Sequence, residues 1–330
     1  MKRSHITRRN TTGKVVITIL IIGLFFIGRS FLDSTIAPDN QAKITQSTAE
    51  SADYEETMLN VGQGLCILIK SDGHYALFDG GSRSASSYVV AYLQQHNITK
   101  LDYVIASHYD EDHIAGLVGV LNTADVDTVL CPDYTTDTQI YRSFKSAVAT
   151  SGAKVVHPSV KSTYSLGNST ITVLGPASYN DRTDNNRSIA VRIDDNKFSS
   201  VITGDAEQQE EQEILNSGIN LRTNLYVAGH HGSSNSSSSD FVKAMSPAYI
   251  FISCGKNNSY GHPHWEALRI FKDTGCKIFR SDDQGEVTCF SDGKKYWFSI
   301  EPSDDWTSGS GYSISGKPVT IEQGSDSHRS

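Results

Sequence analysis

Four side chains that commonly bind metal ions lie within six consecutive positions, at His108, Asp110, Asp112 and His113. Histidine offers a neutral nitrogen and aspartate a hard anionic oxygen, and both are ordinary ligands of Zn²⁺ and Mn²⁺. Because side chains alternate along an extended backbone, His108 and Asp110 would project to one side. Asp112 and His113 fall further along and can face a second ion. The segment therefore predicts a metal site.

The flanking residues predict the elements that hold this segment. An apolar strand, Tyr103–Ala106, directly precedes it, and Ala115-Gly116-Leu117 comes after it at the start of a helix. A structural alternative is a polar loop that caps this helix, with Asp112 as the N-cap. Clustered carboxylates repel one another without a cation, which favours the metal site.

Elsewhere, strands outnumber helices in the first half of the chain, and the two alternate in the second half. Leu65–Lys70 and Tyr75–Phe78 predict a hairpin around Asp72-Gly73. Further strands are predicted at Ile171–Leu174, Ile189–Ile193, Ser200–Thr203, Leu225–Ala228 and Tyr249–Ser253, and helices at Tyr88–His96, Glu207–Asn216, Asp240–Met245 and His264–Thr274. This mixture predicts an α+β domain, a β-rich sandwich with helices on its outer faces.

The N-terminal end predicts a membrane segment. Residues 1–14 carry five basic side chains, and residues 15–32 form an apolar run whose only charged residue is Arg29. The basic residues hold the N-terminus inside, so the chain after the apolar run is expected outside the cytoplasmic membrane. The uninterrupted part, Val15–Gly28, has only 14 residues and suits a signal-peptide core better than a spanning helix. Counted through Leu32, the run has 18 residues, with Arg29 able to reach the interface. Arg29 between Gly28 and Ser30 weakens a cleavage site, however, so an uncleaved single-pass anchor is favoured over a secreted protein.

The composition is that of one folded domain between two polar segments. Apolar residues make up 38% of the 330 residues and charged residues 20%, which permits a sizeable core. Residues 33–54 are polar and predict a linker. Residues 303–330 are rich in Ser and Gly and predict a flexible tail. The domain is therefore expected over residues 55–302.

The net charge and the cysteines exclude several kinds of function. With a formal net charge of −8, the protein is not a general nucleic-acid binder, because phosphate contacts need clustered Lys and Arg. Bound cations can still reverse the field locally. The five cysteines include no CxxC pair, which argues against a zinc knuckle. Cys66 and Cys254 lie in apolar runs and are expected in the core.

The segment after the strand resembles a family signature. His-x-x-x-Asp-His is similar to the HxHxDH motif of metallo-β-lactamase-fold hydrolases, with Asp110 where the second His usually stands. This variant resembles the hydrolase domain of the ComEC family of competence DNA-uptake proteins, whose channel-forming membrane part this chain, with one apolar segment, does not contain. The resemblance implies an αββα sandwich over about residues 56–300. It also rests on Asn60-Val61-Gly62-Gln63-Gly64, Phe78-Asp79-Gly80-Gly81, Asn185-Asn186-Arg187-Ser188, Thr203-Gly204-Asp205-Ala206-Glu207, His230-His231-Gly232-Ser233 and Tyr260-Gly261-His262-Pro263-His264.

The resemblance implies two divalent metal ions, Zn²⁺ or Mn²⁺, the latter because the ligand set is rich in carboxylates. Asp205 resembles the carboxylate that bridges both ions, although it could also be the N-cap of a helix over 206–216. Asn185 stands near where many relatives have another His. An amide oxygen is a weak ligand, so the first ion is loosely held or Asn185 only orients water. The other implied ligands are His108 and Asp110 for the first ion, and Asp112, His113 and His231 for the second.

The same resemblance puts more histidines and a polar loop near the metals. His262 and His264 are candidates for the acid that protonates the leaving group, and Asp112 is counted with them as catalytic. His262 could instead be a surface-turn residue and His264 an early helix residue. The candidates for substrate binding are His230, Ser233, Lys256 and Asn258, and a plain polar loop is the alternative for the last two.

Two cations bridged by Asp205 would lower the pKa of a shared water and clamp a phosphodiester for attack. The sequence therefore predicts a membrane-anchored extracytoplasmic phosphodiesterase or nuclease, with DNA among its candidate substrates and a link to DNA uptake. A hydrolase of a cell-wall or lipid phosphoester, an ester or a lactam is an alternative, and so is a non-catalytic binding module. Relatives usually begin the opening motif with Asp and end it with Asp, whereas this chain has Asn60 and Leu65, so any contribution of those carboxylates is lost.

Overall fold

The computed structural model describes residues 52–180 and 182–319. The basic N-terminus 1–14, the predicted membrane segment 15–32 and most of the predicted linker 33–54 therefore lie outside the described residues. Within the described ranges, no helix has both the length and the apolar character needed to cross a membrane.

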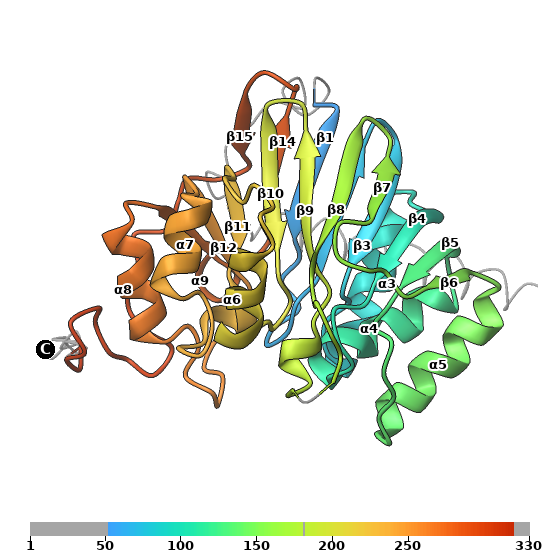
Figure 1. Cartoon of the computed structure of the whole chain (residues 1–330), viewed down its shortest axis with the longest axis horizontal. Helices are drawn as coiled ribbons and strands as arrows, with labels where there is room; N and C mark the ends of the chain where they lie inside the picture. Colours follow the sequence, from blue (N-terminus) through green and yellow to red (C-terminus); the bar gives the residue numbers. More distant parts are fainter. Residues whose placement is uncertain (1–51, 181, 320–330) are drawn as a thin grey trace, which may run out of the picture. The chain divides into compact units, whose positions relative to one another are not determined.

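Two β-sheets pack face to face, with helices on their outer sides (Figure 1). The first sheet has the strand order β15-β14-β1-β2-β3-β4-β5-β6. Its strands are β1 (Tyr54–Met58), β2 (Ile67–Ser71), β3 (His74–Phe78), β4 (Lys100–Ile105), β5 (Asp125–Leu130), β6 (Lys154–Val156), β14 (Val287–Ser291) and β15 (Tyr296–Phe298). The second sheet has the order β13-β12-β11-β10-β9-β8-β7. Its strands are β7 (Thr163–Leu166), β8 (Ser169–Gly175), β9 (Ala190–Asp195), β10 (Phe198–Ile202), β11 (Leu225–Val227), β12 (Tyr249–Ile252) and β13 (Lys277–Arg280).

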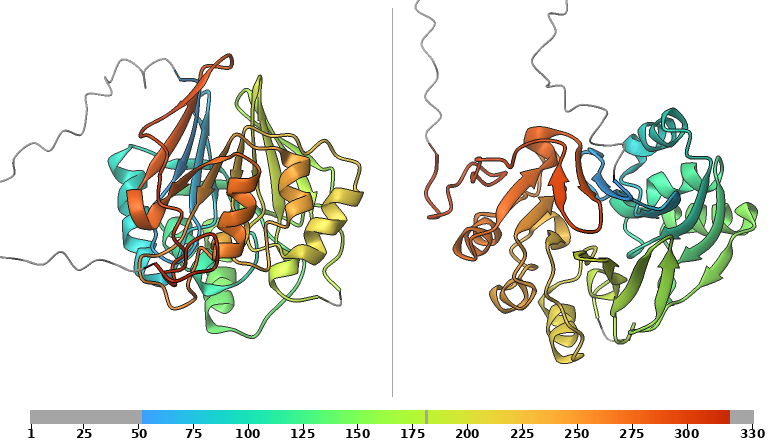
Figure 2. Two further views of the ribbon diagram at one scale, coloured as in Figure 1. Left: turned by 90° about the vertical axis from the view of Figure 1, so that its left-hand side faces the viewer. Right: turned by 90° about the horizontal axis from the view of Figure 1, so that it is seen from above.

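The helices divide between the two outer faces, as the view from above makes clear (Figure 2). The helices beside the first sheet are α3 (Ser86–Gln95), α4 (Glu111–Leu121) and α5 (Gln139–Ser151), and those beside the second sheet are α6 (Gln208–Asn216), α7 (Ser239–Met245) and α8 (Trp265–Asp273). The described residues also form four short helices: η1 (Arg83–Ala85), η2 (Asn185–Arg187), η3 (Gly229–Gly232) and α9 (Ser281–Gln284). The predicted sandwich with helices on its outer faces is confirmed.

Three apolar layers hold these elements together. Between the sheets, side chains such as Ile67, Phe78 and Phe251 are fully buried. A second cluster joins the first sheet to its helices, and a third joins the second sheet to its own helices. Cys66 and Cys254 are both buried in these layers, as their apolar surroundings predicted.

The β2–β3 hairpin is where the sequence predicted it. Asp72 and Gly73 form its turn with φ angles of 49° and 78°. Two positive φ angles are typical of the tight turn that matches the twist of a two-strand hairpin, and Asp-Gly is a preferred pair for it. The hairpin leads β3 into Asp79, whose carboxylate contacts the amide of Ser107 after β4.

Close backbone packing brings α4 against the end of β3. A Cβ added to Gly116 would lie 1.8 Å from the carbonyl oxygen of Gly80, so only glycine fits at this contact. The amide of Gly80 also donates a hydrogen bond to the carbonyl of His113 at 2.8 Å. These contacts fix the first turn of α4, which carries Asp112 and His113.

The N-cap roles considered as alternatives for Asp112 and Asp205 are both wrong. The N-cap of α4 is Asp110, and Asp112 already lies in the first turn. The N-cap of α6 is Glu207, two residues after Asp205. Neither Asp110 nor Glu207 makes a side-chain capping bond. The carboxylates of Asp112 and Asp205 therefore remain available for other contacts.

The described part of the predicted tail, residues 303–319, has little regular structure but is held against the domain. The Arg280 guanidinium donates hydrogen bonds to the backbone carbonyls of Asp305 and Thr307 at 3.1 and 2.6 Å. The amide of Gly309 donates to the carbonyl of Pro263 at 3.0 Å. This segment thus packs on the loop before α8, where a flexible tail was expected.

Candidate metal centre

The side chains predicted as ligands come from both sheets and meet at the ends of their strands. His108 lies after β4 of the first sheet, whereas Asp205 lies after β10 and His231 after β11 of the second. Asp112 and His113 lie in the first turn of α4. The cluster therefore forms only when the two sheets are packed together.

His108, His113 and Asp205 form a first group, in which one ligand atom from each residue lies within 4.8 Å of the others. The Nε2 atom of His113 is 3.2 Å from Oδ1 of Asp205, and Nε2 of His108 is 4.0 Å from Oδ2 of the same carboxylate. Gly204, with a φ of +54°, permits this approach, because a Cβ there would lie 2.5 Å from the Cβ of Ser107. The two oxygens of Asp205 thus face different histidines.

Asp112, His113 and His231 form a second group of the same kind. The Nε2 atom of His231 is 3.3 Å from Oδ2 of Asp112 and 3.6 Å from Oδ1 of Asp205. Nε2 of His113 is 3.9 Å from the same oxygen of Asp112. His113 therefore belongs to both groups, and Asp205 reaches both.

The atoms that point into this cluster lack hydrogen-bonding partners. They are the Nε2 atoms of His108, His113 and His231 and the Oδ1 atom of Asp205, all buried. A buried polar atom without a partner is costly, and four that converge on one place are rarely tolerated by chance. Imidazole nitrogens and a carboxylate oxygen are suitable ligands for Zn²⁺ or Mn²⁺, so the donor set fits divalent cations.

The opposite nitrogen of each of these histidines is already held. The Nδ1 partners are a carboxylate, a backbone carbonyl and a hydroxyl at 2.8, 2.9 and 3.0 Å, namely Asp79 for His113, Ser253 for His231 and Ser107 for His108. Such bonds fix the ring orientation of a metal-binding histidine. The arrangement leaves Nε2 as the free ligand atom in all three rings.

Asp79 is a functional residue that the sequence reasoning did not single out. Its side chain is fully buried, accepts a hydrogen bond from the amide of Ser107 at 2.8 Å and from its hydroxyl at 2.7 Å, and also holds His113. It lies 34 positions before His113 in the chain. The available signal was an aspartate directly after a buried strand and before Gly80-Gly81.

Charges within the cluster are strongly coupled. Burial would raise the pKa of Asp205, but the neighbouring His113 and His231 hold it well below its usual range. Burial would likewise lower the pKa of His113, but the carboxylates of Asp205 and Asp112 raise it well above its usual value. The Asp205 carboxylate is therefore ionised, and the raised pKa of His113 favours a balancing proton on its imidazole. A divalent cation would displace that proton on binding.

A family model described as the metallo-beta-lactamase superfamily matches residues 59–255. The chain belongs to this superfamily. It is similar to ComE operon protein 3 of Bacillus subtilis (strain 168), with 25% identity over 273 residues, which are 77% of this chain and 35% of that protein. It is also similar to Competence protein ComA of Neisseria gonorrhoeae, with 26% identity over 254 residues, which are 76% of this chain and 32% of that protein. Both are ComEC-family competence proteins, and the chain spans about a third of their length.

Among solved structures, CmlA, a diiron β-hydroxylase from Streptomyces venezuelae, has a TM-score of 0.50 at 14% identity, covering 73% of this chain and 54% of that one. This likeness concerns the fold alone. The metallo-beta-lactamase fold implies divalent metal binding, and the converging unpaired atoms of this chain fit such ions.

Three other predicted residues lie around the cluster but belong to neither ligand group. Asp110 is half-exposed, with Oδ2 at 3.5 Å from Nε2 of His108. Asn185 donates to Oε1 of Glu207 at 3.3 Å and lies 3.5 Å from Nδ1 of His230. His230 itself turns its Nε2 toward Oδ2 of Asp205, at 3.5 Å. The structure thus places Asn185 behind His230, and His230 closer to the shared carboxylate.

The two histidines predicted as acids have different surroundings. The buried ring of His262 lies 6.0 Å from that of His231 and 5.5 Å from that of His230, centre to centre. Burial and the neighbouring imidazoles lower its pKa to about 3. His264 is the N-cap of α8; its Nδ1 accepts from the amide of Ser234 at 2.9 Å, and its Nε2 contacts the carbonyl of Tyr260 at 3.0 Å. Both nitrogens of His264 are therefore engaged by backbone groups.

The predicted substrate-binding residues also differ. Asn258 is fully used inside its loop, since its amide donates to the carbonyls of Gly255 and His262 and its oxygen accepts from the amides of Tyr260 and His262. Ser233 is buried, and its hydroxyl accepts from the amide of Asn235 at 3.3 Å. Lys256 is exposed. Of these three, only Lys256 presents its side chain to solvent.

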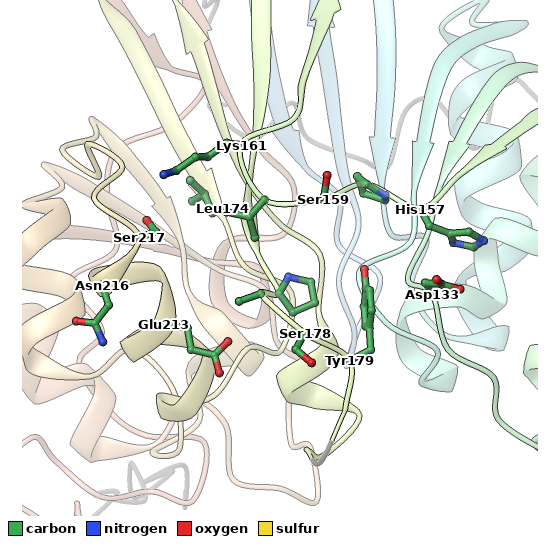
Figure 3. Close-up of a pocket in the computed structure, with 14 residues that line it drawn as sticks. Asp133, His157, Ser159, Lys161, Leu174, Ser178, Tyr179, Glu213, Asn216 and Ser217 are labelled. Carbon is green, nitrogen blue, oxygen red and sulfur yellow. The ribbon is translucent and has the colours of Figure 1, made fainter.

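A cavity of about 740 Å³ lies away from the cluster (Figure 3). Its lining combines residues that come after β5 and β6, such as Asp133 and His157, with residues that come after β8, such as Tyr179, and with Glu213 of α6. None of the predicted metal-binding or catalytic residues lines it. This cavity is therefore separate from the candidate metal centre.

Proposed function

We propose that this protein is a phosphodiesterase that uses two divalent metal ions and acts outside the cytoplasmic membrane. The observation that carries the proposal is the shared position of Asp205, whose two oxygens face different histidines. A carboxylate placed in this way can hold two cations at once, an arrangement that suits phosphoryl transfer.

The residues at and around the metal centre each have a defined task in this proposal. Two divalent cations, when bound, supply Lewis-acid activation of the phosphoryl group. Asp205 spans the two ligand groups, and His113 and His231 present Nε2 to them. Asp79 keeps the ring of His113 in that orientation through its contact with Nδ1. His262 is neutral near pH 7 because its pKa is low. We therefore assign it a hydrogen bond to the substrate and not the role of general acid.

The substrate class rests on the ligands and on the relatives. The carboxylates among the candidate ligands are hard donors, which favour Mn²⁺ as well as Zn²⁺, and such cations bind phosphate oxygens. The curated relatives are competence proteins by name, which supports DNA as the first polymer to test. The location rests on the basic residues 1–14 and the apolar run 15–32.

The test uses the full chain, purified in detergent, stripped with EDTA and reloaded with Zn²⁺ or Mn²⁺. We expect two ions per chain by elemental analysis, and cleavage of single-stranded DNA, of RNA or of bis-p-nitrophenyl phosphate. Cleavage of a chromogenic β-lactam without cleavage of any phosphodiester would reject the substrate class. Full ion binding without hydrolysis of anything in the panel would support a binding module instead.

Protease added to intact cells tests the location separately. We expect digestion of the domain at the cell surface after removal of any outer layer. Full protection, with digestion only after lysis, would reject the extracytoplasmic placement without affecting the proposed chemistry.

A further inference from the structure

The loop between β12 and α8 carries an aromatic side chain that the metal chemistry does not use. Tyr260 is 65% exposed, whereas the other large apolar or aromatic side chains exposed among the described residues are between 39% and 45% exposed. Its ring lies nearly parallel to that of His262, with an interplanar angle of 17° and 5.6 Å between centres. An aromatic ring kept in water beside a candidate active site can bind a flat ligand.

The loop holds the backbone of Tyr260 in place. The amide of Tyr260 donates to Oδ1 of Asn258 at 3.1 Å, and its carbonyl accepts from His264 at 3.0 Å. The segment after residue 302 closes on the same loop, since a Cβ on Gly309 would lie 2.1 Å from the carbonyl oxygen of His262. Little backbone entropy therefore remains to be lost when a ligand stacks on this side chain.

A continuous series of rings connects Tyr260 to the metal centre. Tyr260 stacks on His262, and the ring of His262 is 6.0 Å from that of His231. His231 belongs to the second ligand group. His262 thus lies between Tyr260 and the cluster, and the exposed Lys256 shares the loop of Tyr260.

We propose that Tyr260 is the stacking site for a base of a single-stranded polynucleotide whose phosphodiester reaches the metal centre, with Lys256 contacting an adjacent phosphate. The inference rests on the proposed phosphodiesterase function and names its substrate class. An aromatic ring that stacks any base, beside a lysine for the backbone, is the combination that binds single strands without sequence preference.

The test compares two oligomers of equal length, oligothymidylate and an oligomer of abasic deoxyribose phosphates. The wild-type protein should have a lower KM for the oligomer that carries bases. In Tyr260→Ala the KM for oligothymidylate should rise about ten- to a hundredfold, which brings the ratio of the two KM values near one. Tyr260→Trp should keep the wild-type ratio, because indole also stacks. Tyr88→Ala, a change of an exposed tyrosine on α3, is the matched control and should leave the ratio unchanged.

Lys256→Gln separates the phosphate contact from the base contact. It should raise KM for both oligomers by a similar factor and make the dependence of KM on salt concentration less steep. An unchanged KM ratio in Tyr260→Ala would overturn the stacking role. Wild-type cleavage of bis-p-nitrophenyl phosphate but of neither oligomer would overturn the substrate class alone, and cleavage of no phosphodiester would overturn the proposed function as well.

Discussion

Among the places where this domain buries unpaired polar atoms, the metal centre and β1 differ most in their surroundings. At the metal centre, four such atoms from three chain segments converge between the ends of the two sheets. On β1, between the sheets, Glu56 is also fully buried, and its Oε1 has no partner. Its other oxygen accepts a hydrogen bond from the hydroxyl of Tyr54 at 2.6 Å.

The two places differ in what can neutralise the buried carboxyl group. Burial raises the pKa of Glu56 to about 7, so a single proton neutralises it. The pKa of Asp205 is instead held well below its usual range by His113 and His231, against the effect of its burial. A buried carboxyl with no charged neighbour is neutralised by a proton. A carboxylate beside histidines whose Nε2 atoms are unpaired forms, together with them, a binding site for a cation. Substitutions at either place therefore test this difference.

The largest effect is expected at Asp205. Asp205→Ala removes the carboxylate that faces both ligand groups, so we expect loss of both ions and a fall in turnover of at least about a thousandfold. Because three apolar layers hold the fold without it, circular dichroism should be unchanged. Elemental analysis and phosphodiester assays provide the measurement, with Asp240→Ala, an exposed aspartate of α7, as control. Retention of both ions and near-normal rates would refute the bridging role.

The next effect concerns stability at Glu56. Below its usual pKa of 4.5, the carboxyl is protonated in both the folded and the unfolded state. Between pH 4.5 and about 7 the unfolded state loses this proton and the folded state keeps it, so the free energy of unfolding falls as pH rises. The loss amounts to about 3 kcal/mol and is complete above pH 7.

Glu56→Gln removes this titration while nearly preserving shape. Urea unfolding of the EDTA-treated wild type and variant at several pH values isolates the effect as the difference between the two proteins. The variant should be the more stable protein at about pH 8, and its advantage should shrink as pH falls. An advantage that stays constant with pH would mean that Glu56 titrates normally.

Apolar patterning was enough to predict much of the fold. The β2–β3 hairpin and the helix α3 were recognised from their alternation and periodicity, and the sandwich from the order of elements. Strands with mixed patterns were missed: β1 reads Tyr-Glu-Glu-Thr-Met and hides Glu56, whose burial depends on β10 and other partners distant in the chain. A local pattern cannot reveal a polar residue that tertiary packing buries.

At the site, the family resemblance pointed to residues that the structure brings together, but not to the residue that supports them. His108, His113 and Asp205 come together in one group, whereas Asp79 reaches His113 from a different strand end. Local spacing carries no information about such a contact. The alternative role of Asp112 as the N-cap is wrong because of another contact between distant residues. The packing of Gly116 on Gly80, and not a capping side chain, fixes the beginning of α4.

The smallest effect is expected at His264, where the sequence suggested a proton donor. Its two nitrogens instead join the loop at Ser234 to the loop at Tyr260. We therefore expect His264→Ala to cost about 1–2 kcal/mol of stability, because the half-buried amide of Ser234 and the exposed carbonyl of Tyr260 each lose a partner. The rate on bis-p-nitrophenyl phosphate should fall by less than about tenfold, with the same pH profile as wild type, whereas loss of a general acid would lower it by about 10²–10⁴-fold.

The same substitution, His264→Ala, also tests the proposed stacking of a base on Tyr260. With the carbonyl of Tyr260 released, its ring is less well fixed, so the KM for oligothymidylate should rise more than the KM for the abasic oligomer. His264→Asn, whose amide oxygen can still accept from Ser234, should recover part of the stability without recovering the contact to Tyr260. A rate loss beyond about a hundredfold on the small diester, together with a lost limb of the pH profile, would restore His264 as the acid and would show that its backbone contacts open during turnover.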